Sequence, residues 1–121
     1  MEIDSQNIIV NKSKAFALKS ISLYRYLINE KREFILSKQF LRSATSIGAN
    51  VREAIRGQSA ADFGAKMNIA LKEACETEYW LELLQESEYL SITDSEEILN
   101  NCRELTKILM AIVKTTFTKN K

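Results

Sequence analysis

Apolar residues recur along this chain at spacings of three and four, which is the period of an amphipathic α-helix. The pattern predicts helices separated by short polar breaks. We expect the first helix to begin near Asn11 or Ser13 and to end at Lys31. The second is expected to begin at Ser37, whose hydroxyl can cap it, and to end near Ile55.

The second half of the chain repeats this pattern. Ser59 followed by Asp62 resembles a capping box and predicts the start of a third helix, and a fourth is expected to open at Thr93 or Asp94. Short connections between helices favour an all-α, antiparallel up-and-down four-helix bundle, with residues 1–121 as one domain. The predicted core positions of the last two helices are Phe63, Met67, Ala70, Ala74, Leu81, Leu84, Ile98, Cys102, Leu105, Leu109 and Ile112.

Two segments depart from a plain helical pattern. Ile8 to Val10 precede the first predicted helix, and we expect an arm that packs on a neighbour or on the end of the bundle, with a short flexible tail as the alternative. Gly48 lies in the middle of the second helix, where glycine costs about 1 kcal/mol relative to alanine. Since Ala44 and Ala49 beside it are also small, another backbone is expected to approach closely here.

A stripe of polar side chains follows one face of the second predicted helix. In an antiparallel hairpin centred near Ser59, Arg42 lies level with Glu76, and Asn50 lies level with Asn68. We expect a buried or half-buried network that fixes helix register or subunit contacts, with solvated surface residues or a ligand or nucleic-acid site as the alternatives. The predicted network comprises Arg42, Ser46, Asn50, Glu53, Asn68 and Glu76.

Charge is segregated between the same two helices. Every charged residue from Glu73 to Glu88 is acidic, whereas the second helix is mainly basic. Such complementary faces can pair within the hairpin or between protomers. Tyr79 and Trp80 lie beside an occupied core stripe, so they are candidate anchors of an oligomer interface, with burial inside the monomer as the alternative.

Composition argues against several classes of function. The chain contains no histidine, the commonest general base and metal ligand, so we expect no enzyme activity, metal site, cofactor or small-molecule substrate. Cys75 and Cys102 lie inside predicted helices and match no metal spacing, which indicates reduced core thiols in a cytoplasmic protein. No apolar run approaches the roughly 20 residues that span a bilayer, so no membrane association is expected.

A family resemblance rests on the runs FLRSATSIGANVREA and KMNIALKEACETEYWLELL. They resemble the four-helix-bundle family of proteins encoded by intervening sequences in bacterial 23S rRNA genes. The family pattern has an apolar residue before Arg-Ser, then Ser-Ile, two small residues, Asn, an aliphatic residue and Glu, and later Ile-Ala followed by Glu. The matching positions here are Leu41, Arg42, Ser43, Ser46, Ile47, Asn50, Val51, Glu53, Ile69, Ala70 and Glu76.

This resemblance implies a bundle that assembles into a ring-like homopentamer. It also implies kinship with the accessory protein of diversity-generating retroelements, which binds a reverse transcriptase and nucleic acid. Most members of the family have no established activity. The leading hypothesis is therefore a non-catalytic, homo-oligomeric assembly or binding module, whose partner would be RNA or another protein.

Direct nucleic-acid binding is the alternative function. A net charge of +1 argues against coating nucleic acid by bulk charge, although the symmetry of a ring would gather the few basic residues of each chain into a larger surface. The candidate contacts are Arg25, Lys31, Arg32, Arg52, Arg56 and Lys66.

Overall fold

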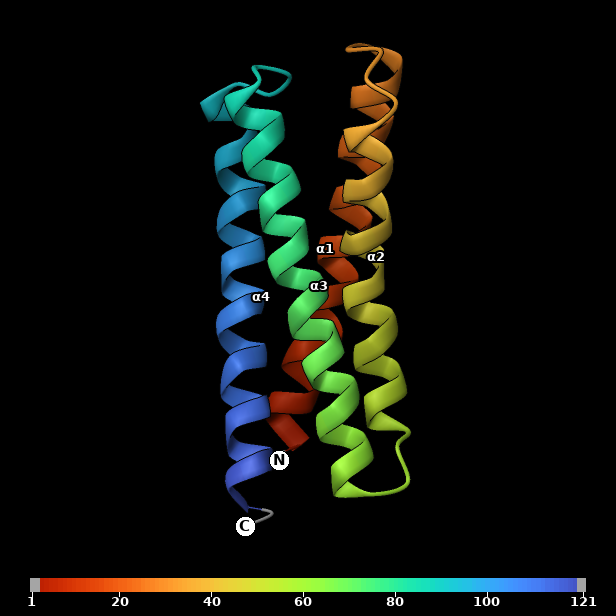
Figure 1. The fold of residues 1–121 in the computed structure, drawn as a ribbon, viewed down its shortest axis with the longest axis vertical. Helices are drawn as coiled ribbons and strands as arrows, with labels where there is room; N and C mark the ends of the chain where they lie inside the picture. The colour runs from red at the N-terminus through yellow and green to blue at the C-terminus, as the bar shows by residue number, and fades with distance from the viewer. Residues whose placement is uncertain (1–2, 120–121) are drawn as a thin grey trace.

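The computed structural model describes residues 3–119, which form four helices joined by short connections (Figure 1). Helix α1 spans Ile3–Asn29, α2 spans Leu36–Ile55, α3 spans Ala60–Glu86 and α4 spans Ile92–Lys119. Successive helices run in opposite directions, so the α1–α2 and α3–α4 connections lie at one end and the α2–α3 connection lies at the other (Figure 1). The predicted all-α, up-and-down four-helix bundle is confirmed.

Helix α1 begins at Ile3, well before the predicted start at Asn11 or Ser13. The predicted arm at Ile8 to Val10 is therefore wrong, because these residues continue the helix. Neither glycine nor proline interrupts this segment. Ile9 is fully buried on the same face as Ser13 and Phe16, so the segment packs into the bundle.

Glu33, not Ser37, caps the start of α2. The Glu33 carboxylate accepts hydrogen bonds from the backbone N–H groups of Ile35 at 3.1 Å, Leu36 at 2.9 Å and Ser37 at 2.6 Å. Ser37 is buried in the first turn, and its Oγ donates back to the Glu33 carbonyl at 2.7 Å. The prediction of Ser37 as the cap is wrong because an acidic side chain in the connection reaches the free N–H groups first.

The two later helices both begin with a serine cap. Ser59 Oγ accepts from the N–H of Asp62 at 3.0 Å, which confirms the predicted start of α3. Ser91 Oγ accepts from the N–H of Asp94 at 3.0 Å, so α4 begins at Ile92 and not at Thr93 or Asp94. The same three-residue spacing from serine to aspartate therefore opens both helices.

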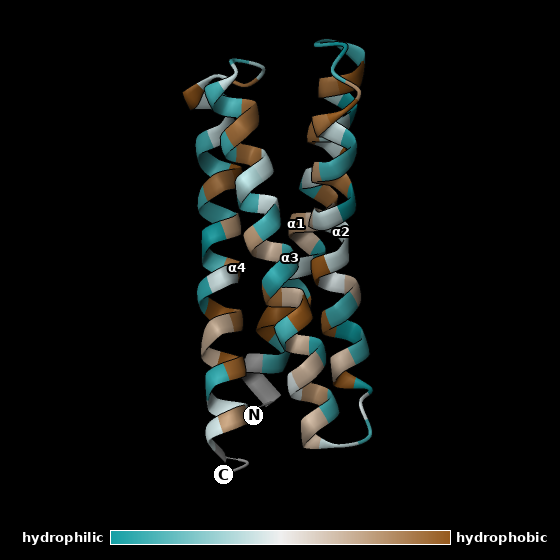
Figure 2. Cartoon of the chain, viewed as in Figure 1, coloured by the Kyte–Doolittle hydropathy of each residue, from teal (hydrophilic) through white to brown (hydrophobic). Residues whose placement is uncertain are grey.

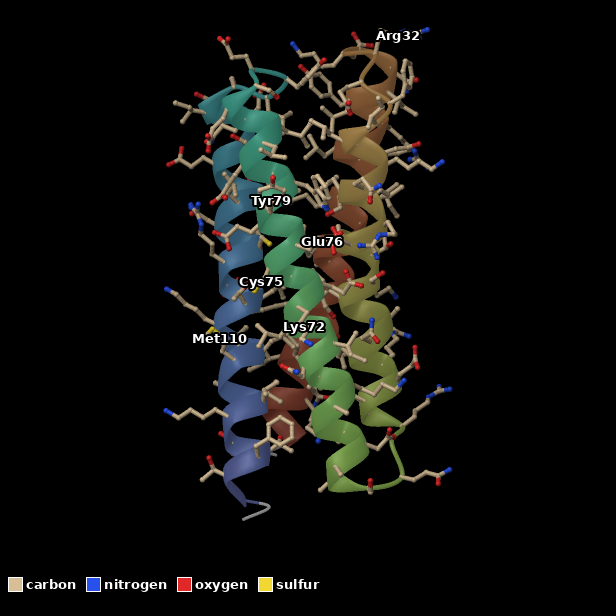
Figure 3. All side chains as sticks on the ribbon, in the orientation of Figure 1. Arg32, Lys72, Cys75, Glu76, Tyr79 and Met110 are labelled. Atoms are coloured by element: carbon tan, nitrogen blue, oxygen red, sulfur yellow. The ribbon has the colours of Figure 1, made fainter. Side chains whose placement is uncertain are left out.

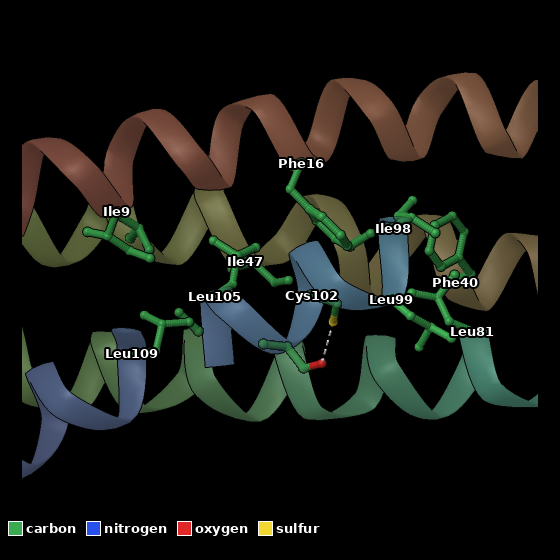
Figure 4. Packing of buried hydrophobic residues seen from close by; sticks show 14 of the residues in the cluster. Ile9, Phe16, Phe40, Ile47, Leu81, Ile98, Leu99, Cys102, Leu105 and Leu109 are labelled. Atoms are coloured by element: carbon green, nitrogen blue, oxygen red, sulfur yellow. Dashed lines mark hydrogen bonds between the residues drawn. The ribbon is translucent and has the colours of Figure 1, made fainter. Parts of the chain in front are cut away.

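The core runs along the bundle axis between the four helices (Figures 2 and 4). Every predicted core position of α3 and α4 is buried except Phe63, which is half-buried against the core. Helices α1 and α2 also contribute large side chains that are fully buried in the core. These include Ile9, Leu27, Phe40 and Ile47. None of the helices in residues 3–119 combines the length and apolar character needed to cross a membrane.

The two cysteines differ in their surroundings. Cys102 is fully buried and its Sγ lies 3.3 Å from the carbonyl oxygen of Ala74 on α3 (Figure 4). Burial raises the pKa of the Cys102 thiol to about 12, so this thiol is inert at neutral pH. Cys75 is exposed, and the expectation that both thiols lie in the core is therefore wrong for Cys75.

Gly48 lies against α1, as the run of small residues predicted. A Cβ at this position would lie 3.6 Å from the backbone carbonyl carbon of Ser13 and 3.4 Å from Ser13 Oγ. Gly64 on α3 is more crowded, because a Cβ there would lie 3.1 Å from Thr116 Cγ2 and 3.3 Å from the Phe117 ring. Both glycines therefore allow close packing between helices, and Gly48 leaves more space for an added Cβ than Gly64 does.

Gly48→Ala is expected to raise the free energy of unfolding by up to about 1 kcal/mol. Alanine is more favourable than glycine in a helix interior by about 1 kcal/mol, and the new methyl group makes ordinary van der Waals contacts with Ser13. Gly64→Ala is the matched control, because the same gain is offset by the crowding against Thr116 and Phe117. Urea denaturation of the two variants measures the difference, and an equal gain in both would contradict it.

Candidate functional site

Arg42 bridges α2 and α3 on the surface of their hairpin. Its guanidinium donates to both carboxylate oxygens of Glu73 at 3.3 Å and also to Glu76. Trp80 Nε1 donates to the same Glu76 carboxylate at 3.0 Å. This contact confirms the antiparallel register that placed Arg42 level with Glu76, and it extends the network to Glu73 and Trp80.

The Arg42 network is half exposed in a single chain, since 50% of the Arg42 side chain is accessible to water. The hydrogen bond from Trp80 lowers the pKa of Glu76, burial opposes this shift, and Arg42 lowers it further. Hydrogen bonds to Glu73 and Glu76 raise the pKa of Arg42. Arg42 and Glu76 are therefore charged at neutral pH, and the ion pairs of Arg42 are expected to contribute no more than about 1 kcal/mol to folding.

The remaining stripe residues of α2 bond mainly along their own helix. Ser46 Oγ donates to the carbonyl of Arg42 at 2.7 Å, and Asn50 Nδ2 donates to the carbonyl of Ser46 at 2.9 Å. Glu53 forms an ion pair with Lys66 of α3 at 3.2 Å. The stripe is thus a half-buried seam along the hairpin, with cross-helix contacts near each end.

Asn68 is half-buried on α3, where the antiparallel register predicted that it would face Asn50. The amide nitrogen of Asn50 is directed to its own helix and not to Asn68. The buried polar contact between these helices is instead made by Thr77, whose Oγ1 donates to Ser43 Oγ at 2.8 Å. Sequence reasoning missed this pair because small hydroxyl residues also fit an apolar stripe.

The acidic stretch of α3 pairs with helices on both sides. Arg103 of α4 donates to Glu78 at 2.9 Å and lies 3.7 Å from Glu82, while Arg42 of α2 binds Glu73 and Glu76. Charge complementarity therefore already acts within one chain, which was one of the two predicted outcomes. The ion pairs with α2 and those with α4 lie along two sides of α3. The side chains of α3 that lie between these two rows of ion pairs point away from the bundle.

We call this surface the outer face of α3: Ile69, Lys72, Tyr79, Trp80 and Leu83. Tyr79 is 53% exposed and Ile69 is 41% exposed, while Trp80 and Leu83 are half-buried. The rings of Tyr79 and Trp80 are tilted by 58°, with centroids 5.2 Å apart. Figure 3 shows Lys72 and Tyr79 on the side of α3 that faces away from the bundle axis. An aromatic pair thus lies at a surface that no other element within residues 3–119 covers.

The predicted nucleic-acid contacts do not form one patch. Arg25, Lys31 and Arg32 lie near the α1–α2 connection, whereas the other three candidates lie near the α2–α3 connection at the opposite end. The length of α2 separates the two groups by about 30 Å. Lys66 is also paired with Glu53. The candidate basic residues are Arg25, Lys31, Arg32, Arg52, Arg56 and Lys66, and all but Lys66 are exposed.

A shallow groove lies between α1 and α4, and its basic side chains are already paired. Lys12 binds Glu104 at 3.0 Å, and Lys19 binds Glu97 and also Asn101, at 2.9 Å from the latter. Among the described residues that line it, the groove therefore offers no unpaired cation to an anionic ligand. Within residues 3–119, no group of three histidine, cysteine, aspartate or glutamate side chains is placed to hold a metal ion.

Comparisons with known proteins agree with this fold. A sequence model of the family described as 23S rRNA-intervening sequence protein matches residues 5–111. The chain is similar to a crystal structure from Bacteroides thetaiotaomicron VPI-5482, described as a protein with unknown function from the S23 ribosomal protein family. The two are 54% identical, the match covers 91% of this chain and 98% of that chain, and the TM-score is 0.89. No curated protein matches the chain.

Proposed function

We propose that this chain, which belongs to the family of 23S rRNA-intervening sequence proteins, is a non-catalytic module that assembles with copies of itself through the outer face of α3. The observation that carries the proposal is the exposure of Tyr79 and Ile69 in the middle of a helix whose opposite face is core. Exposed aromatic and aliphatic side chains at one site are typical of an interface.

The polar network beside this face supports the same function. Trp80 is held by its hydrogen bond to Glu76, which in turn is held by Arg42. The tilted ring of Tyr79 rests against Trp80. A surface fixed in this way loses little conformational freedom when a partner covers it, which favours association. The network is therefore assigned a positioning role for the interface and no chemical role.

A second copy of the chain fits this surface by charge. The carboxylates that border the outer face of α3 outnumber the arginines that pair with them, because Glu73 and Glu76 share Arg42 while Glu78 and Glu82 share Arg103. The outward side of α2 instead carries Lys38, Arg52 and Arg56. A head-to-tail contact between the α3 face of one copy and a more basic face of the next closes into a ring when the rotations between successive copies add up to a full turn. The homopentamer implied by the family resemblance is one such ring, and RNA or a partner protein would then meet the assembled surface.

Tyr79→Glu is expected to disrupt this assembly, because a buried, unpaired carboxylate would replace an interface anchor. Sedimentation velocity at micromolar concentration is expected to give the wild-type chain several times the 13.8 kDa mass of one chain. The variant is expected to sediment as one or two chains, with an unchanged helical circular dichroism spectrum because Tyr79 lies outside the core.

Tyr79→Phe is the matched control, since it keeps the ring and removes only the hydroxyl group. It is expected to retain the mass of the wild-type assembly. A monomeric wild-type chain would contradict self-assembly itself. An assembled wild type whose mass is unchanged by Tyr79→Glu would instead show that the interface lies elsewhere, so the two failures are distinguishable.

A further inference from the structure

Two exposed turns lie at the same end of the bundle, one on each side of its long axis (Figure 1). The basic tip is the α1–α2 connection, where Lys31, Arg32, Phe34 and Ile35 are exposed, and Figure 3 labels Arg32 there. Of its two glutamates, Glu33 is buried against backbone N–H groups and Glu30 is exposed, so the exposed side chains carry a net positive charge. The acidic tip is the α3–α4 connection with its flanks and carries Glu86, Glu88, Tyr89 and Ile92. One end of the molecule therefore presents two surfaces that each combine apolar and charged side chains. The net charges of the two surfaces are opposite.

The apolar residues of both tips are unusually exposed for their type. Ile35 on the basic tip is 76% exposed and Ile92 on the acidic tip is 72% exposed. No other large hydrophobic side chain in the described part of the chain is as accessible. Isoleucine is normally among the most buried residues, so two at one end indicate a surface that is covered in use.

Each tip also holds a charged residue in a costly backbone conformation. Arg32 has a φ of 55° and Glu88 has a φ of 69°, and these are the non-glycine residues with left-handed φ in residues 3–119. Left-handed backbone disfavours side chains and is retained where the surrounding structure requires it. Each tip thus places a charged side chain in a left-handed conformation within three residues of the end of a helix, and the two charges are opposite.

Both tips are fixed before any partner arrives. The basic tip is held by the Glu33 carboxylate, and the Arg32 guanidinium carbon lies 5.3 Å from the centre of the Phe34 ring. The acidic tip is held by backbone hydrogen bonds from Tyr89 and Leu90 to the carbonyl of Leu84, at 3.0 and 3.1 Å. Preformed surfaces of this kind bind with a small loss of freedom.

We propose that this end of the bundle binds a second copy of the chain head to head, with the basic tip of each copy against the acidic tip of the other. A two-fold axis perpendicular to the bundle would bring Arg32 next to Glu88 of the partner copy, and the reverse contact would form at the same time. The same operation would cover Ile35 and Ile92 with each other.

The self-complementary charge is the reason for choosing a second copy as the occupant. An unrelated acidic partner would be repelled by Glu86 and Glu88, and a basic partner would be repelled by Lys31 and Arg32. Nucleic acid would likewise meet carboxylates at half of this surface.

The tips lie at the end of the bundle and the outer face of α3 lies on its side, so this contact is separate from the lateral assembly proposed above. Together the two contacts would join two lateral assemblies.

Charge reversal tests the tip contact. Arg32→Glu and Glu88→Arg are each expected to halve the mass measured by light scattering at low salt, because each places like charges across the contact. The double variant R32E/E88R restores opposite charges between copies and is expected to return the wild-type mass. Ile35→Ser is expected to halve the mass independently of charge.

Unchanged mass in both single variants would overturn the proposal, and so would a double variant that stays at half mass. The outcome is independent of lateral assembly. If the α3 contact fails, the tip contact still predicts a wild-type dimer and a monomeric Arg32→Glu variant. If the tip contact fails, Tyr79→Glu still dissociates the assembly and Arg32→Glu has no effect.

Discussion

Replacing Phe40 with alanine is expected to lower the free energy of unfolding by about 3–5 kcal/mol. Phe40 is fully buried, and its ring lies in the core with Leu81, Ile98 and Leu99 (Figure 4). Removing the ring leaves a cavity between helices that are tied to one another by short connections, so the site can collapse only in part. Urea denaturation followed by circular dichroism measures the loss.

Arg42→Ala, two residues along the same helix, is the matched comparison. Arg42 is half exposed, and its ion pairs with Glu73 and Glu76 are open to water, so its loss is expected to cost no more than about 1 kcal/mol. If both variants lost the same stability, the Arg42 network would be an interior strut of the single chain and not part of its surface. A small loss of stability together with a weakened assembly would support the positioning role proposed for Arg42.

The helical pattern predicted the architecture because it is repeated over many residues. Each helix carries its apolar stripe over several turns, and a chain without proline offers few ways to break it. The core positions Cys102, Leu105 and Leu109 of α4 follow directly from this period and are buried. A residue that departs from the pattern at one position hardly changes a prediction that rests on many positions.

Helix ends depend on single side chains, and there the prediction was weaker. Glu33 reaches three N–H groups of α2 from outside the helix, a role that the usual preference for Ser, Thr, Asp or Asn does not indicate. Ser91 opens α4 although Thr93 and Asp94 offered equally good caps. The start of α1 was misplaced because Ile8 to Val10 suggested an apolar run and concealed the burial of Ile9.

The candidate site was predicted in part because antiparallel register is simple arithmetic. It placed Arg42 beside Glu76, but it gave neither the depth of the contact nor the buried Ser43–Thr77 pair. The exposure of a side chain depends on how far its helix is rotated about its own axis. The packing of all four helices together determines that rotation. The two tips were beyond sequence reasoning for a related reason, since Arg32 and Glu88 are far apart in the chain and share only an end of the folded bundle.

Glu33→Ala is expected to lower the free energy of unfolding by about 2–3 kcal/mol, because one buried and two partly buried N–H groups lose a charged acceptor. Burial alone would raise the pKa of Glu33, but the hydrogen bonds from Leu36, Ser37 and Ile35 outweigh it and lower the pKa below the ordinary 4.5. A lowered pKa in the folded state means that this stabilisation is full above pH 4.5 and is lost as the pH falls through the folded value.

Glu33→Gln separates the charge from the shape of this cap. Glutamine keeps one carbonyl oxygen at nearly the same place, so its loss of stability at neutral pH is expected to be smaller than that of alanine, and it cannot titrate. The difference in stability between the wild type and Glu33→Gln is therefore expected to shrink as the pH falls below 4.5. A difference that stays constant from neutral to acid pH would show that folding leaves the pKa of Glu33 unchanged, and it would contradict the lowered pKa.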